Sequence, residues 1–156
     1  MSITRHTPIA VFCGALLLST ASCEHQPVPS PAVAAEWCCM LKNTYHEARG
    51  EGVAGMQAVA AVTLNRAAQT GNTICDTVYA HKQFSWTNTT KGRNKPIEGD
   101  TAVLYTVVAQ AMSGAMQDIT GGATHYHTKQ VKPVWRKALD KVVVINNHIF
   151  YKGRNQ

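Results

Sequence analysis

The sequence predicts an α+β fold, with about three main helices followed by a small antiparallel β-sheet. Two observations carry this prediction. Apolar residues recur at helical spacing in segments between residues 37 and 117, whereas short strand-like runs begin at residue 124. Helices followed by strands, rather than helices alternating with strands, favour α+β over α/β. A chain of 156 residues has room for one such domain.

The N-terminal part of the chain has the composition of an export signal. Arg5 precedes an apolar run from Ile9 to Leu18, which small residues and Cys23 follow. The run is too short to span a membrane in the mature protein. Because residues 18–23 are similar to a lipobox, we expect residues 1–22 to be removed and Cys23 to carry a lipid. The alternative is an ordinary cleaved signal. Either way, we expect an exported protein at the periplasmic face of the cell envelope.

Residues 23–35 contain three prolines among small and polar residues, which predicts an extended tether. The folded domain is then expected at residues 36–156. The whole chain has 15 Lys and Arg against nine Asp and Glu, a net charge of +6. In an exported protein this charge favours an anionic cell wall polymer or membrane surface as partner. The basic residues are dispersed and form no nucleic-acid-binding motif, so we expect no nucleic acid partner.

The first helix is expected at residues 37–49, where apolar positions form a stripe that ends near Gly50. Residues 53–68 are apolar on almost all sides, which indicates a buried helix. Ile74, Val78 and Tyr79 suggest only a short helical turn, and the polar residues 87–99 are expected to form a surface loop.

The third main helix is expected at residues 101–117, after Asp100 as its N-cap. Residues 124–128 alternate as a short strand would. Residues 142–145 and 148–151 flank Asn146-Asn147, which predicts a β-hairpin because Asn tolerates the positive φ of such turns. Residues 131–139, between these strands, are expected to form a loop with one helical turn.

Cys38, Cys39 and Cys75 are the cysteines of the expected domain. In an oxidising compartment we expect a disulfide from Cys38 or Cys39 to Cys75, with Cys39 favoured. The alternative is buried free thiols. Structural zinc is not expected, since the C-x-x-C pairs of such sites are absent.

The segment Tyr45-His46-Glu47-Ala48-Arg49-Gly50-Glu51 is the strongest candidate for chemistry. Glu47 lies at the edge of an apolar helix face, where burial can raise its pKa and make it a general acid. This requires Arg49 to point away, because a close cation would lower that pKa. The alternative for Glu47 is a solvated side chain. The alternative for Glu51 is a carboxylate that only stabilises the first turn of the next helix through the helix dipole.

Gln83-Phe84-Ser85-Trp86 places two aromatic rings beside hydrogen-bonding side chains. This combination suits sugar rings, which have apolar faces and polar rims. The alternative is that both rings belong to the core.

A series of short motifs gives these segments a common interpretation. In chain order they are Cys39-Met40-Leu41, Tyr45 to Glu51, Gly55 to Ala60, Asn65-Arg66, Thr73-Ile74-Cys75, Val78-Tyr79, Gln83 to Trp86, Tyr126-His127, Val131 to Trp135 and His148 to Tyr151. Together they resemble the SleB/CwlJ-type cell wall hydrolase domain, over nearly all of residues 37–152. Two departures are Gly52-Val53 in place of a usual proline, and Lys82 in place of a frequent cysteine. The second departure favours Cys39–Cys75 further.

The resemblance implies a lysozyme-like fold and cleavage of the peptidoglycan glycan strand. We expect no cofactor. The resemblance also implies Glu47 as the catalytic acid, with Glu51 second as a supporting carboxylate. The segment Gln83-Phe84-Ser85-Trp86 and the pair Tyr126-His127 would border the sugar groove. We expect a monomer.

Several activities fit these residues. A lytic transglycosylase needs only one carboxylate, as acid and then base, whereas a hydrolytic muramidase wants two. An amidase that cuts the muramoyl–alanine bond would need zinc, for which His125, His127 and His148 are candidate ligands. We expect no metal. A non-catalytic peptidoglycan-binding lipoprotein is the alternative of another class, and it would not need Glu47.

Overall fold

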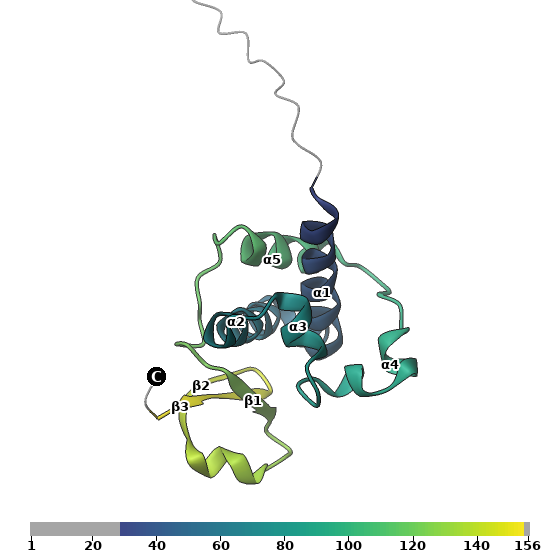
Figure 1. The fold of residues 1–156 in the computed structure, drawn as a ribbon. Coiled ribbons are helices and arrows are strands. Elements are labelled where there is room, and N and C mark those ends of the chain that lie inside the picture. Colours follow the sequence, from purple (N-terminus) through teal and green to yellow (C-terminus); the bar gives the residue numbers. More distant parts are fainter. Residues whose placement is uncertain (1–28, 155–156) are drawn as a thin grey trace, which may run out of the picture.

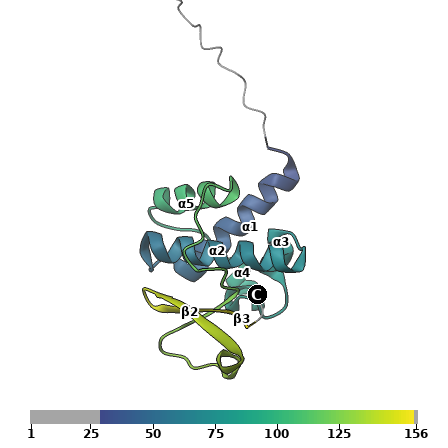
Figure 2. The same cartoon turned by 90° about the vertical axis from the view of Figure 1, so that its left-hand side faces the viewer.

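The computed structural model describes residues 29–154 as a helical layer packed on a small sheet (Figure 1). Helix α2 lies between α5 and the sheet in both views (Figures 1 and 2). The α+β prediction is therefore confirmed, although short helices add to the three main ones. The helical elements are α1 (Pro31–Ala48), α2 (Gly52–Thr70), α3 (Ile74–Tyr79), η1 (Ser85–Asn88), α4 (Thr90–Arg93), α5 (Ala102–Met112) and η2 (Val134–Ala138).

Helix α1 begins earlier than the sequence predicts. Ser30 is its N-cap, with its hydroxyl accepting from the Val33 N–H, and Pro31 occupies the first turn. Proline suits this position because it has no N–H to satisfy and its φ is already helical. Residues 31–35, expected in the tether, thus belong to α1. The expected signal segment and Cys23 lie outside the described residues.

The buried character predicted for residues 53–68 is confirmed in α2, where Val59, Ala60 and Val62 have no exposed surface. Gly71 ends the helix in the left-handed region at φ 70°, which glycine adopts without steric cost. Met40 of α1 and Val108 of α5 are buried on one side of α2. Within residues 29–154, no helix is both long and apolar enough to cross a membrane.

The sheet has three antiparallel strands in the order β1-β3-β2. They are β1 (His125–Thr128), β2 (Leu139–Ile145) and β3 (His148–Gly153). The predicted hairpin is confirmed, and Asn146 adopts a positive φ of 48° in its turn. Fully buried Phe150 of β3 packs against Ala58 and Val62 of α2. This contact fixes the sheet on the helices and so sets the position of β1.

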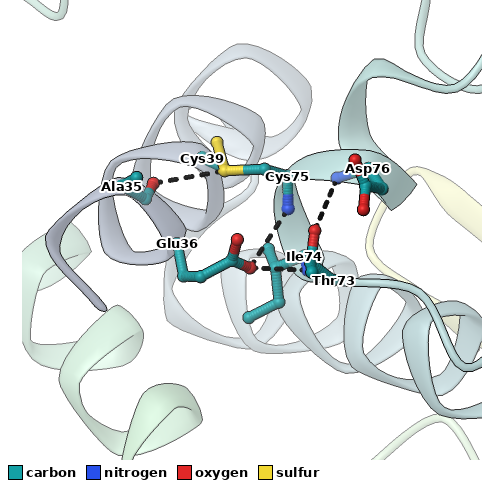
Figure 3. The surroundings of a disulfide bond; sticks show 7 residues. All are labelled: Ala35, Glu36, Cys39, Thr73, Ile74, Cys75 and Asp76. Carbon is teal, nitrogen blue, oxygen red and sulfur yellow. Dashed lines mark hydrogen bonds between the residues drawn. A yellow bond between two sulfur atoms is a disulfide. The ribbon is translucent and has the colours of Figure 1, made fainter. Parts of the chain in front are cut away.

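A disulfide joins Cys39 of α1 to Cys75 of α3, as the sequence favours (Figure 3). Beside it, the Glu36 carboxylate accepts from the backbone N–H groups of Ile74 and Cys75 at 2.6 and 3.2 Å. Cys38 is exposed and free. The disulfide and the carboxylate together hold the start of α3 against α1, and the segment that follows α3 reaches the candidate site.

Two segments differ from their predicted form. The polar stretch 87–99 is not all loop, because the hydroxyl of Thr89 caps the short helix α4 by accepting from Gly92 N–H. Helix α5 ends at Met112 rather than near residue 117, and Gly114 turns the chain away with φ 76°.

Candidate active site

Glu47 lies in the last turn of α1 and points toward the sheet. Its Oε2 accepts a hydrogen bond from the Tyr126 hydroxyl at 2.8 Å, across a sequence separation of 79 residues. Tyr126 is in β1, and its ring packs against Phe150 in the sheet core. The contact between sheet and helices therefore holds a phenol against the carboxylate.

The environment of Glu47 favours its protonated form. Burial raises the pKa of Glu47, while the hydrogen bond from Tyr126 and the positive charge of Arg66 oppose that shift without cancelling it. A carboxylic acid that keeps its proton closer to neutral pH can serve as a general acid. The geometry thus agrees with the acid role predicted from the sequence.

Arg49 does not pair with Glu47. Its guanidinium carbon lies 5.1 Å from the centre of the Tyr45 ring, one turn back along the chain. The expectation that Arg49 points away is therefore confirmed. The cation that acts on Glu47 is Arg66 of α2, which sequence reasoning did not place in the site.

Two contacts hold Arg66 in the site. Its Nε donates to the backbone oxygen of Thr124, and its guanidinium carbon lies 4.9 Å from the centre of the Phe84 ring. No carboxylate among residues 29–154 is within ion-pair distance of it. The sequence signal that could have indicated Arg66 is its position at the polar end of an otherwise apolar helix.

Glu47 opens into a groove of about 420 Å³. Five of the predicted substrate-binding residues line it, namely Gln83, Phe84, Ser85, Tyr126 and His127. The structure adds lining residues that were not predicted for substrate binding, namely Arg66, Thr128, Val131 and His148. Within the described part of the chain, Glu47 is the one carboxylate that lines the groove.

Trp86 is the exception among the predicted groove residues. It is 9% exposed, and its indole N–H donates to the Asn43 side chain at 3.0 Å. Its ring packs against His46 and Tyr79. Its low exposure, its satisfied N–H and its neighbouring rings make Trp86 part of the core, so its assignment to the groove is corrected.

Glu51 also lies outside the groove lining. Its carboxylate accepts from the Asn147 N–H at 3.0 Å, and its backbone oxygen accepts from the Asn146 side chain. The hairpin turn is thereby bound to the start of α2. Gly55 permits this approach, because a Cβ there would lie 2.2 Å from the Cβ of Glu51.

The histidines considered as zinc ligands make other contacts. The two ring nitrogens of His127 lie 2.8 Å from the Thr128 backbone oxygen and 3.0 Å from the Tyr151 hydroxyl. Nδ1 of His148 is buried 3.9 Å from the Glu51 carboxylate. Across the described ranges, no three His, Cys, Asp or Glu side chains gather as a metal site.

Comparisons with known proteins agree with this geometry. The catalytic domain of the Bacillus cereus SleB protein is 27% identical, with a TM-score of 0.65, and the match covers 80% of this chain and 95% of that one. The catalytic domain of a germination-specific lytic transglycosylase, SleB from Bacillus anthracis, is 27% identical, with a TM-score of 0.66, over 80% of this chain and 100% of that one. A search of curated proteins found no match.

The family model described as Cell Wall Hydrolase matches residues 50–151, which is more than half of the sequence. Its match begins just after Glu47 and includes the groove residues from α2 to β3. The resemblance found in the sequence motifs is confirmed: the chain belongs to the cell wall hydrolase family of enzymes.

Proposed function

We propose that this enzyme cleaves the peptidoglycan glycan strand between N-acetylmuramic acid and N-acetylglucosamine, as a lytic transglycosylase. Family membership supports a cell wall substrate, and one of the similar structures is described as a lytic transglycosylase. The observation that carries the proposal is Glu47: within residues 29–154 it is the one carboxylate in the groove, and its pKa is raised by burial.

In the first step, the Glu47 carboxyl group donates its proton to the glycosidic oxygen. The bond between this oxygen and the anomeric carbon of muramic acid breaks, and N-acetylglucosamine leaves with a new hydroxyl. In the second step, the Glu47 carboxylate takes the proton of the muramic acid 6-hydroxyl. The 6-oxygen then bonds to the anomeric carbon and closes a 1,6-anhydro ring. Glu47 ends protonated, and no water is consumed.

The surroundings of Glu47 suit this alternation. The Tyr126 hydroxyl holds Oε2, and Oε1 accepts no hydrogen bond from the described residues, which leaves it available for proton exchange. Arg66 supplies positive potential that stabilises the carboxylate formed in the first step. Burial favours the acid before that step, so neither protonation state is locked in.

The hydrolytic alternative has less support. A muramidase needs a second carboxylate about 5–5.5 Å or 6.5–9.5 Å from the first, according to its stereochemistry. The nearest candidate in sequence, Glu51, has its carboxylate bonded to the Asn147 N–H and is not part of the groove lining. We therefore infer that Glu51 positions the hairpin rather than reacting.

Export and lipid attachment at Cys23 belong to this proposal as predictions from the sequence. Peptidoglycan lies outside the cytoplasmic membrane, so the proposed activity requires export. Mass spectrometry of the N-terminal peptide from the producing cell tests both. A diacylated peptide starting at Cys23 agrees with both predictions. A cleaved but unmodified N-terminus contradicts lipidation alone, and an N-terminus still at Met1 contradicts both.

The products of digestion test the reaction itself. Purified peptidoglycan is incubated with the protein, and the soluble fragments are identified by mass spectrometry. We expect muropeptides with 1,6-anhydromuramic ends, each lighter by one water than the hydrolytic product. New reducing ends would establish a muramidase, and free peptides an amidase. Binding without any fragment would contradict catalysis.

A further inference from the structure

A second cavity adjoins the groove at Arg66. Its volume is about 260 Å³, and it shares Arg66 and Gln83 with the groove that holds Glu47. Gln69 and Asn72, at and beyond the end of α2, line its exposed part, and Thr77 of α3 lines its buried part. A substrate bound over Glu47 can therefore reach this cavity with a side group.

Two of the residues that line this cavity each have a buried hydrogen-bonding group without a partner among the described residues. These groups are Nη1 of Arg66 and the hydroxyl of Thr77, which is a residue only 4% exposed. Both belong to residues that line the cavity. A buried donor left unpaired costs about 1–3 kcal/mol, and more for a charged group. Two such donors at one cavity indicate that a ligand with acceptor oxygens completes them.

The charge of the cavity indicates an anion. No Asp or Glu is among its described lining residues, and Arg66 has no carboxylate within ion-pair distance in the same part of the chain. His125 also lines the cavity, but burial and the charge of Arg66 lower the pKa of His125. His125 is therefore neutral at neutral pH, and Arg66 is the cation of the cavity. A planar guanidinium recognises carboxylates well.

We propose that this cavity, which we call the Arg66 cavity, binds a carboxylate of peptidoglycan next to the bond that is cleaved. The inference rests on the proposed function and deepens it, since the carboxylate of the lactyl or peptide group on muramic acid becomes part of substrate recognition. Two sources carry such a carboxylate: the peptide stem, and the lactyl group of strands from which the peptide has been removed. Nη1 of Arg66 and the Thr77 hydroxyl would donate to its oxygens.

The test places a negative charge at the exposed part of the cavity, without touching the groove. Asn72→Asp is nearly isosteric and, being exposed, leaves the core intact. Asn94→Asp at the end of α4 adds the same charge away from both cavities, as the matched control. Both full-length variants are assayed on native peptidoglycan, on peptidoglycan whose carboxylates are converted to carboxamides, and on amidase-treated strands that keep only lactyl carboxylates.

We expect Asn72→Asp to lower kcat/KM about fivefold, relative to the carboxamide substrate, on the strands that carry the bound carboxylate, native or amidase-treated, from repulsion between unit charges near water. Asn94→Asp should not change this ratio. An equal loss on all three substrates would overturn the proposal, because the effect would then not depend on a carboxylate. No loss on any of the three would overturn it as well.

The amidase-treated strands distinguish the two sources. The lactyl carboxylate is free only where the peptide has been removed. A loss on native strands therefore shows that the ligand is on the peptide, and a loss on amidase-treated strands alone shows that the ligand is the lactyl carboxylate. Absence of cleavage of every substrate by the wild-type protein would instead refute the proposed function, so the two failures are distinguishable.

Discussion

Tyr126→Phe tests how the site balances the two protonation states of Glu47. The substitution removes the hydroxyl that donates to Glu47 Oε2 at 2.8 Å, while the ring keeps its contact with Phe150. This hydrogen bond lowers the pKa of Glu47, because it is stronger to the carboxylate than to the acid. In the variant, the pKa of Glu47 should therefore rise further above its ordinary value.

The size of the effect follows from the bond that is lost. Hydrogen bonds to charged groups contribute about 1.5–3 kcal/mol, against about 0.5–1.5 kcal/mol for neutral ones. The difference between the charged and the neutral hydrogen bond is about 1–2 kcal/mol. Its loss destabilises, by this amount, the carboxylate that forms when Glu47 donates its proton. Because each 1.36 kcal/mol is a factor of ten in rate, kcat should fall about 5- to 30-fold.

The assay is the pH dependence of kcat for release of soluble fragments from purified peptidoglycan. Activity on the alkaline side is lost as Glu47 gives up its proton, so this limb should move to higher pH in Tyr126→Phe. Tyr105→Phe, which removes an exposed hydroxyl elsewhere, is the control and should leave the limb in place. An alkaline limb that stays, or moves to lower pH, in Tyr126→Phe would refute this reasoning.

Three further predictions concern stability. Burial raises the folded-state pKa of Glu47, so the native state binds more protons than the unfolded state and loses stability as pH rises through the interval between the two pKa values. The gain in Tm of Glu47→Gln over wild type should therefore be larger at neutral pH than below about pH 4. A gain in Tm that does not change with pH would contradict this prediction. Replacing both Cys39 and Cys75 with alanine should lower the free energy of unfolding by about 4 kcal/mol for a loop of 36 residues, measured by urea titration, whereas Cys38→Ala should not. Glu51→Ala should lower the free energy of unfolding by about 1–3 kcal/mol, because the Asn147 N–H loses its acceptor. It should leave the alkaline limb of the pH–kcat profile unmoved. A shifted limb would show that Glu51 takes part in proton transfer.

Local patterns were sufficient for most of the fold. The apolar residues of α2 and the Asn146-Asn147 turn are signals read within one segment, and the structure confirms both. The start of α1 was missed because three prolines suggested a tether. The cap formed by Ser30 makes Pro31 a helix beginning instead.

The site was harder to predict because it is assembled from distant segments. Glu47 could be selected from its place at the edge of an apolar stripe. The direction of Trp86, however, depends on a buried acceptor, Asn43, that is 43 residues away. The relation of Arg66 to Glu47 depends on how α1 crosses α2, which no spacing within one helix reveals. The order of the motifs implied a groove, but only the packing shows which of the predicted residues line the groove and which belong to the hydrophobic core.

The central claim is that Glu47 carries the proton in both steps of the reaction. Its most direct test is kcat of Glu47→Gln on purified peptidoglycan, beside Glu98→Gln, which alters an exposed carboxylate outside the groove. Loss of a general acid and base that no other groove carboxylate replaces should lower kcat by about 10²–10⁴-fold in Glu47→Gln, with Glu98→Gln unchanged. Glu47→Gln activity equal to that of the wild type, with the same anhydro products, would contradict the claim.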